Sequence, residues 1–177
     1  MLTVIYSVAC SVDGFIADAD GGIDWLSRIA IEGEDFGHGE FFGSVDAMVM
    51  GSTTYEQVLG FGEWPYGETP CWVLSSQRLP AASKGVTVTP FDPAAVLSAI
   101  EAQGMQRVWL VGGGQLAGAF RDLQLIDECV VTVIPVILGN GVPLFAGDGP
   151  SSWLQLISSR EMAGGVISLH YERAADS

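Results

Sequence analysis

The chain is organised around the stretch Arg107-Val108-Trp109-Leu110-Val111-Gly112-Gly113-Gly114-Gln115-Leu116-Ala117, in which an apolar run meets three glycines and then helix-forming residues. This order predicts a buried strand, a tight turn and the start of a helix. Glycines let backbone N–H groups approach a ligand that a Cβ would keep away, and at a helix N-terminus such groups favour an anion. Two interpretations stay open from these residues alone: a phosphate-bearing ligand on Gly112–Gly114, or a glycine turn that only packs the helix against the strand.

The composition is that of an acidic globular protein. The chain has 177 residues, 49% of them hydrophobic, which is enough for one domain with a packed core. Its net charge of −14 argues against nucleic acids and membranes as partners. The apolar runs are shorter than the roughly 20 residues of a membrane-spanning helix, and the N-terminus shows no signal-peptide pattern, so we expect a cytoplasmic protein.

The three cysteines, Cys10, Cys71 and Cys129, each lie in an apolar stretch. Their odd number and wide spacing fit neither a disulfide framework nor a metal site, so we expect buried, unreactive thiols. The only histidines are His38 and His170, and we therefore predict no metal site.

Strand-like and helix-like segments alternate along the chain. Strands are expected at Leu2–Cys10, Ala47–Met50, Cys71–Leu74, Val86–Val88 and Ile126–Leu138, and a closing antiparallel pair is expected at Trp153–Ile157 and Val166–Arg173. Helices are expected after Gly51, at Pro93–Ala102 with Asp92 as N-cap, and at Gln115–Leu123. We expect a loop followed by a short helix within Ile29–Phe42. This pattern predicts a single α/β domain over residues 1–177, with a mostly parallel sheet, antiparallel C-terminal strands and flanking helices.

Three of the predicted strands end in residues that suit an anionic ligand. Gly51–Thr54 form a second strand–glycine–helix junction, in which Thr53 and Glu56 fit a capping box. Ser75–Arg78 follow another strand, and Gly112–Gln115 follow a third. Ligands of open α/β sheets bind outside the carboxyl ends of the strands. We therefore expect a dinucleotide there, although the Rossmann spacing G-x-G-x-x-G is absent from the first strand.

The order and spacing of these segments resemble the dihydrofolate reductase superfamily, and more closely the reductase domain of the bifunctional riboflavin-biosynthesis deaminase-reductase. The resemblance covers essentially the whole chain, and the segments that carry it are Val8–Ala17, Val49–Glu56, Val73–Ser76, Val111–Gly114, Leu125–Glu128 and Val133–Gly141. It implies a three-layer dihydrofolate reductase-like fold and an NADPH-dependent reductase of a small heterocycle, of the 5-amino-6-(5-phosphoribosylamino)uracil reductase type. The alternatives are dihydrofolate reductase activity, NADPH binding without catalysis, and an apolar-rich oligomeric scaffold.

The resemblance also assigns the cofactor site. The residues expected to bind the cofactor are Ala9, Ile16, Gly51, Ser52, Thr53, Thr54, Ser75, Ser76, Arg78, Val111, Gly112, Gly113, Gly114, Gln115 and Leu116. Ser52 and Gln115 stand where members of the superfamily often carry a basic residue for the 2′-phosphate, and Ser75, Ser76 and Arg78 could compensate. NADPH is therefore the expected cofactor and NADH the alternative.

The resemblance places a substrate-binding carboxylate between Trp25 and the strand before Gly51. Counting back from Gly51 selects Asp35, whereas counting forward from Trp25 selects Ala30. The candidates are Glu32, Glu34 and Asp35, with Asp35 preferred.

Three further residues are considered near the substrate. Asp13 is either a substrate contact or a turn residue that bonds its own backbone. Trp25 is expected in the wall of the substrate pocket, and Thr132 is expected to bond the heterocycle through water.

The run Ile126–Leu138 is longer and more apolar than one edge strand needs, and members of the family often pair through this region, so we predict a homodimer.

Overall fold

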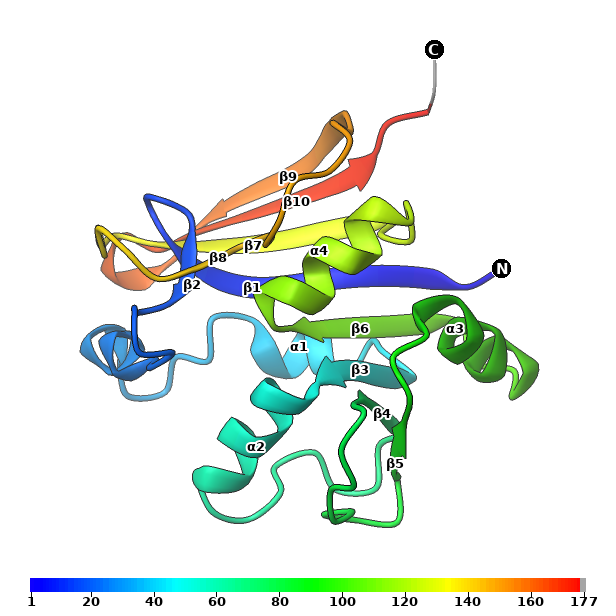
Figure 1. Ribbon diagram of the computed structural model, residues 1–177. Helices are drawn as coiled ribbons and strands as arrows, with labels where there is room; N and C mark the ends of the chain where they lie inside the picture. The colour runs from blue at the N-terminus through cyan, green and yellow to red at the C-terminus, as the bar shows by residue number, and fades with distance from the viewer. Residues whose placement is uncertain (176–177) are drawn as a thin grey trace.

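A large sheet forms the centre of the protein (Figure 1). The computed structural model describes residues 1–175, and in that range the strands are β1 (Thr3–Ser11), β2 (Phe15–Ala17), β3 (Ala47–Gly51), β4 (Cys71–Leu74), β5 (Val86–Thr89), β6 (Arg107–Gly112), β7 (Glu128–Ile134), β8 (Val142–Pro143), β9 (Leu154–Glu161) and β10 (Ile167–Arg173). The order across the main sheet is β5-β4-β3-β6-β1-β7-β10-β9, and β2 pairs with β8.

The strand directions confirm the predicted fold class. Every pairing from β5 through β7 is parallel, whereas β10 and β9 are antiparallel at one edge. Strand β7 lies between β1 and β10, and this interior position accounts for the long apolar run 126–138. Strand β7 therefore has no free edge, and the pairing of two copies through the run 126–138 stays a prediction.

Helices cover both faces of the sheet, which makes three layers. The helices are η1 (Asp24–Ile29), α1 (His38–Phe42), α2 (Ser52–Gly60), α3 (Pro93–Ala102), α4 (Gly114–Asp122) and η2 (Ala163–Gly165). On one face Ile100 of α3 and Phe120 of α4 pack against Tyr6 and Leu110 in one core. On the other face α1 and α2 pack over a second core that contains Trp109.

Local sequence signals predicted the start of α3 but not that of α2. The Asp92 carboxylate accepts the Ala95 N–H at 3.0 Å and Pro93 opens α3, as predicted. The predicted capping box at Thr53 is wrong, because α2 begins at Ser52 with Gly51 as its N-cap and no side chain caps it. Since the strand leads into the helix without a loop, Thr53 lies inside the first helical turn.

The short strands β2 and β8 were not predicted from the sequence. They hold the turn after β1 against the segment after β7. The three cysteines are free and buried, as expected, and burial raises the pKa of the Cys71 thiol to about 12. Among residues 1–175, no helix combines the length and the apolar character that crossing a membrane requires.

Candidate functional site

Two helices begin side by side at the carboxyl edge of the sheet. Strands β3 and β6 are parallel neighbours, with Met50 paired to Gly112, and they lead into α2 and α4. The N-caps of these helices are Gly51 and Gly113, and neither helix has a side-chain cap. The first backbone N–H groups of both helices are therefore available to a single anionic ligand.

The three glycines at 112–114 are required for two structural reasons, backbone conformation and close packing. Gly112 and Gly113 have φ angles of +123° and +87°, which L-residues rarely adopt. A Cβ on Gly114 would lie 2.5 Å from the Pro143 carbonyl oxygen, so this glycine lets α4 pack against β8. The packing interpretation therefore holds for Gly114, whereas Gly112 and Gly113 form the turn that opens α4.

Thr54 joins the two helix starts. Its hydroxyl donates to the Gly112 carbonyl at 3.2 Å, and a Cβ on Gly113 would lie 3.5 Å from the Thr54 Oγ1. The space between the first turns of α2 and α4 is thus narrow and is lined by glycine backbone. The predicted cofactor residues from Gly51 to Thr54 and from Val111 to Leu116 lie together here.

The third predicted strand end follows β4, the other neighbour of β3. Ser75 is buried and its hydroxyl accepts the Gln77 N–H at 3.0 Å, so it shapes the turn. Ser76 and Arg78 are exposed at this edge, and within residues 1–175 Arg78 has no ion-pair partner. A ligand extending from the helix starts toward β4 would therefore meet the Ser76 hydroxyl and the Arg78 guanidinium.

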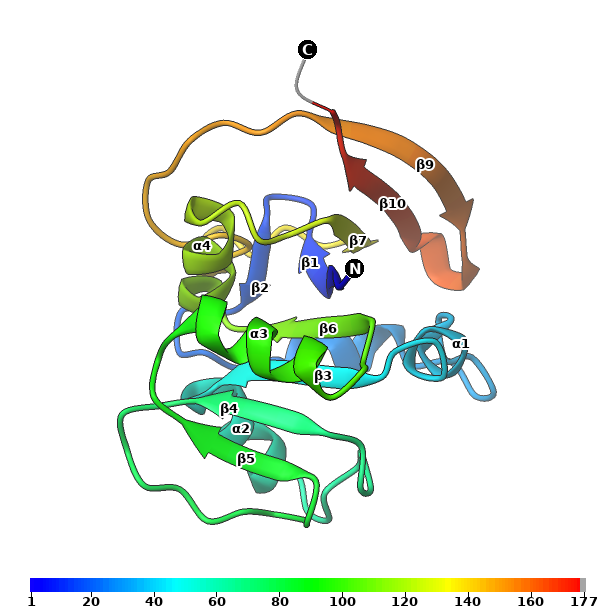
Figure 2. The ribbon, with the colours of Figure 1, turned by 90° about the vertical axis from the view of Figure 1, so that its right-hand side faces the viewer.

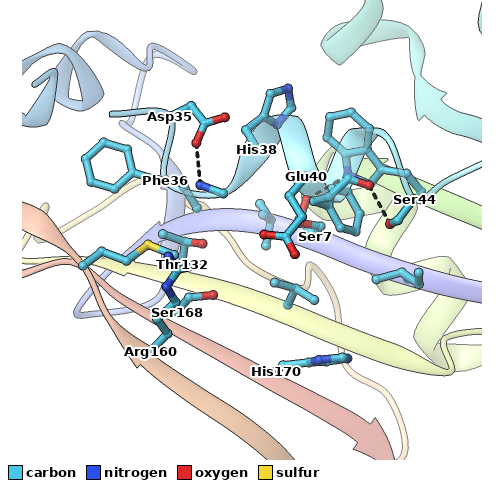
Figure 3. A pocket seen from close by; sticks show the side chains of 18 of the residues that line it. Ser7, Asp35, Phe36, His38, Glu40, Ser44, Thr132, Arg160, Ser168 and His170 are labelled. Carbon is cyan, nitrogen blue, oxygen red and sulfur yellow. Dashed lines mark hydrogen bonds between the residues drawn. The ribbon is translucent and has the colours of Figure 1, made fainter. Parts of the chain in front are cut away.

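A cavity of about 880 Å³ lies on the face of the sheet opposite α4. Its floor consists of residues from β6, β1, β7, β10 and β9, and its other wall runs from η1 to α1 (Figure 3). Figure 2 shows the β9–β10 hairpin curving toward the side of the molecule where α1 lies. Ala9 of β1 and Thr132 of β7 line this cavity, and their expected contacts with a nicotinamide and with a substrate stay predictions.

The polar floor of the cavity follows the register of the strands. Ala9 pairs with Thr132, Thr132 with Ser168, and Ser168 with Arg160, so these four side chains form one row across the sheet. The next row toward the amino ends of the parallel strands contains His170, about 7 Å away, because alternate residues of a strand share a face.

An ion cluster closes the far end of the cavity. The Glu128 carboxylate lies 2.9 Å from the His170 Nε2 and 3.8 Å from an Arg107 guanidinium nitrogen. Four residues that line the cavity were not predicted from the sequence: Glu128, Arg160, Ser168 and His170. The available signal was the alternation of polar and apolar residues in the two C-terminal strands.

The predicted carboxylates have clear structural positions. Asp35 lines the cavity, and its carboxylate accepts the N–H groups of Gly37 at 2.9 Å and Gly39 at 3.0 Å. These bonds, chiefly that from Gly39, lower the pKa of Asp35, so it is held ionised. Glu34 also lines the cavity, whereas Glu32 does not.

Asp13 lies outside the cavity. Its carboxylate accepts the N–H groups of Leu138 at 3.1 Å and Gly139 at 2.7 Å. The Ser11 hydroxyl, together with these two groups, lowers the pKa of Asp13. The Asp13 carboxylate thus ties the turn after β1 to the segment after β7, instead of bonding only the backbone of its own turn, and a contact with the substrate stays a prediction.

Trp25 and Ile16 also lie outside the set of residues that line the cavity. Leu26 and Ile29, from the same helix η1 as Trp25, do line it. The Trp25 indole nitrogen is buried, and it has no hydrogen-bond partner within residues 1–175. The expected contact of Trp25 with a substrate stays a prediction.

The sheet topology, together with the cavity on the face opposite α4, defines an α/β protein of the dihydrofolate reductase-like class. Within that class the chain belongs to the RibD C-terminal domain family, whose model matches residues 2–168, and the resemblance inferred from the sequence is confirmed. The family is one of reductases connected with riboflavin biosynthesis.

Two of the relatives have nearly the same extent as this chain, and a third is longer. YwjB of Bacillus subtilis is 35% identical over 173 residues, which are 97% of this chain and 98% of YwjB. The crystal structure of a Shewanella sp. PV-4 protein described as a riboflavin biosynthesis protein is 31% identical, with a TM-score of 0.89 over 98% of this chain and all of that one. Acinetobacter baumannii RibD shares the fold at 21% identity and a TM-score of 0.73, and the match covers 99% of this chain and 59% of RibD.

Proposed function

We propose that this protein is an NADPH-dependent reductase of a small heterocycle, of the type that acts on 5-amino-6-(5-phosphoribosylamino)uracil, with NADH as the alternative cofactor. The observation that carries the proposal is the pair of uncapped helix N-termini at Gly51 and Gly113, at the same edge of the sheet as the end of β1 that bears Ala9. An extended dinucleotide has its negative charge in the middle and its reactive ring at one end, which suits this arrangement.

The residues at the helix starts fit a pyrophosphate. Backbone N–H groups of α2 and α4 would hold it, because a helix N-terminus favours an anion. The glycine at each N-cap adds no side chain of its own to this approach. Ser76 and Arg78 would meet the adenosine end, and Ala9 would border the nicotinamide. When bound, the cofactor supplies the hydride.

The cavity fits a planar substrate. Its volume of about 880 Å³ falls within the common range for small-molecule sites, roughly 300–1,000 Å³. Phe36, Phe41 and Trp109 line it, and aromatic side chains pack well on a heterocyclic ring. These three would provide the apolar wall that the sequence analysis assigned to Trp25.

Asp35 would position the heterocycle. Its carboxylate is held ionised by backbone N–H groups, so it suits accepting hydrogen bonds from N–H groups of a pyrimidine or pterin. A carboxylate with a lowered pKa is a poor proton donor near neutral pH. The proton for the reduction would therefore come from water rather than from Asp35.

The proposal is tested by cofactor binding followed by turnover. Dialysed protein would be titrated with NADPH and with NADH, and the loaded protein would then be assayed with the phosphoribosylamino-pyrimidine and with dihydrofolate. We expect tighter binding of NADPH and turnover of the pyrimidine. Turnover of dihydrofolate alone would change the substrate, binding without turnover would favour a sensor, and no binding at millimolar concentration would refute the proposal.

A further inference from the structure

The turn between β7 and β8 contains Asn140 followed by Gly141, and Asn140 is the only asparagine of the chain. Both residues lie in the irregular segment that precedes β8, and the Asn140 side chain is exposed. Asparagine is a thermolabile residue. It is most reactive when glycine follows it, because the next backbone nitrogen then approaches the side-chain carbonyl carbon without a Cβ in the way. The sequence at Asn140 therefore has the pattern that spontaneous deamidation requires.

The structure brings the two reacting groups together. The Gly141 N–H donates to the Asn140 Oδ1 at 2.8 Å. Since a C=O bond is about 1.23 Å long, the Gly141 nitrogen lies no more than about 4 Å from the Asn140 Cγ, the atom that it would attack. Within residues 1–175 the Asn140 amide nitrogen donates no hydrogen bond, so no contact in that range retains it as a leaving group.

Other side chains that precede a glycine are less suited to the same reaction. Gln103 precedes Gly104, but its amide nitrogen donates to a helix carbonyl at 3.3 Å, and its longer side chain would have to form a six-membered ring. An aspartate before glycine carries an ionised carboxylate, which is a poor electrophile and has no ammonia to lose. The aspartates in this position are Asp13, Asp20 and Asp148. Loss of ammonia is thus expected first at position 140.

We infer that Asn140 is a site of spontaneous deamidation, in which Gly141 is the nucleophile. The Gly141 nitrogen gives its proton to solvent hydroxide and forms a bond to the Asn140 Cγ, and ammonia leaves, so that a five-membered succinimide results. Water then opens the ring at either carbonyl and gives aspartate or isoaspartate. The net reaction adds one water and releases one ammonia, with no oxidation or reduction.

The products would disturb the contact between the turn after β1 and the segment after β7. Gly141 packs against β2, because a Cβ on Gly141 would collide with the carbonyl oxygen of Ala17, a residue of the β2–β8 pair (Figure 1). Isoaspartate inserts one extra carbon into the backbone just before Gly141, where this contact leaves no room. Both products also add a negative charge next to Gly139, whose N–H bonds the Asp13 carboxylate. Deamidation should therefore separate β2 from β8.

The test ages the full chain in mildly alkaline buffer. Peptide mass spectrometry follows the mass increase that accompanies replacement of the Asn140 amide by a carboxyl group, and an isoaspartyl methyltransferase labels the isoaspartate. A synthetic peptide of residues 136–144 gives the rate of the same reaction without the fold. We expect the folded chain to react within tenfold of the rate of the peptide, and the Tm of the aged chain to fall by about 2–4 °C.

The matched control is Asn140→Gln, which keeps an amide at this position but needs the slower six-membered ring. It should keep its mass and its Tm when the wild type has changed. A folded chain that reacts more than tenfold more slowly than the peptide would show that the fold protects Asn140, and the inference would be overturned. Equal labelling of Asn140→Gln and the wild type would assign the isoaspartate to an aspartate–glycine pair and would also overturn it.

The consequence for the fold has its own outcome. Deamidation at position 140 with an unchanged Tm would keep the modification site and overturn the separation of β2 from β8. The inference does not depend on the proposed function, because mass, labelling and Tm are all measured without a cofactor or a substrate.

Discussion

Replacing Gly113 by alanine tests whether the paired helix starts bind the cofactor. The φ angle of Gly113 is +87°, and a non-glycine residue in such a conformation costs about 1–3 kcal/mol. For a protein of this size each kcal/mol lowers the Tm by about 2–4 °C, so we expect a decrease of roughly 2–12 °C. The new methyl group would lie 3.5 Å from the Thr54 Oγ1, between the first turns of α2 and α4.

The same methyl group should weaken cofactor binding. It would stand where a phosphate must approach the backbone N–H groups, and a hydrogen bond to a charged group contributes about 1.5–3 kcal/mol. Losing one such bond lowers affinity by about 10- to 150-fold. Titration of the variant with NADPH, followed by calorimetry or by nicotinamide fluorescence, measures this change.

Gly104→Ala provides the matched control. Gly104 has a φ angle of +81° and no atom within 4 Å of its would-be Cβ, so the substitution adds comparable backbone strain at the end of α3, outside the helix starts. Both variants should lose stability, and only Gly113→Ala should lose affinity for NADPH. Equal affinities for NADPH in the two variants would refute the assignment of the cofactor to the helix starts.

Three other predictions concern the cofactor preference, pH and assembly. Arg78→Ala should weaken NADPH binding about tenfold and leave NADH binding unchanged, because Arg78 is the exposed cation at the adenosine end; parallel titrations of the two cofactors decide this. Asp46 accepts the N–H groups of Gln106 and Arg107 at 2.8 and 2.9 Å, and these bonds lower its pKa. Its stabilising effect is therefore present above the unfolded pKa of about 4 and is lost as pH falls through the folded pKa. Urea unfolding of Asp46→Asn should consequently show a loss of stability at pH 7 that disappears in acid, and a pH-independent difference would count against the linkage. Two copies should pair through the outer strand β9, an edge strand on which Ile157 is 47% exposed and which follows Trp153, 84% exposed. Light scattering should show a dimer for the wild type and a monomer for Ile157→Lys, and a monomeric wild type would contradict the pairing.

The parts of the fold that rest on local signals could be predicted from the sequence. Asp92 and Pro93 mark a helix start by themselves, and the apolar run of β1 marks a central strand. The pair formed by β2 and β8 could not be predicted in the same way. These strands have three and two residues, and they exist only because the turn after β1 meets the segment after β7.

The cofactor edge and the cavity floor differ in how far they could be predicted. The cofactor edge could be predicted because three strands each end in their own glycine or hydroxyl residues, and because parallel strands bring such ends together. The floor depends on register between strands that are distant in sequence. Arg160 and Ser168 lie on the neighbouring strands β9 and β10, in which polar and apolar residues alternate. Which face of these two strands is covered depends on the pairing of Ser168 with Thr132 and on the curvature of the sheet.

The acidic composition changes how anionic ligands would be held. Charges separated by more than about 8 Å are largely screened at physiological ionic strength, so the net charge of −14 does not exclude an anion from a site with its own donors. At the cofactor edge the proposed donors are backbone N–H groups of two helices, with Arg78 as the cation proposed for the adenosine end. The backbone groups would bind the pyrophosphate of NADPH and of NADH alike. The preference for NADPH would therefore depend on one guanidinium, and this is why a single substitution at Arg78 should separate the affinities for the two cofactors.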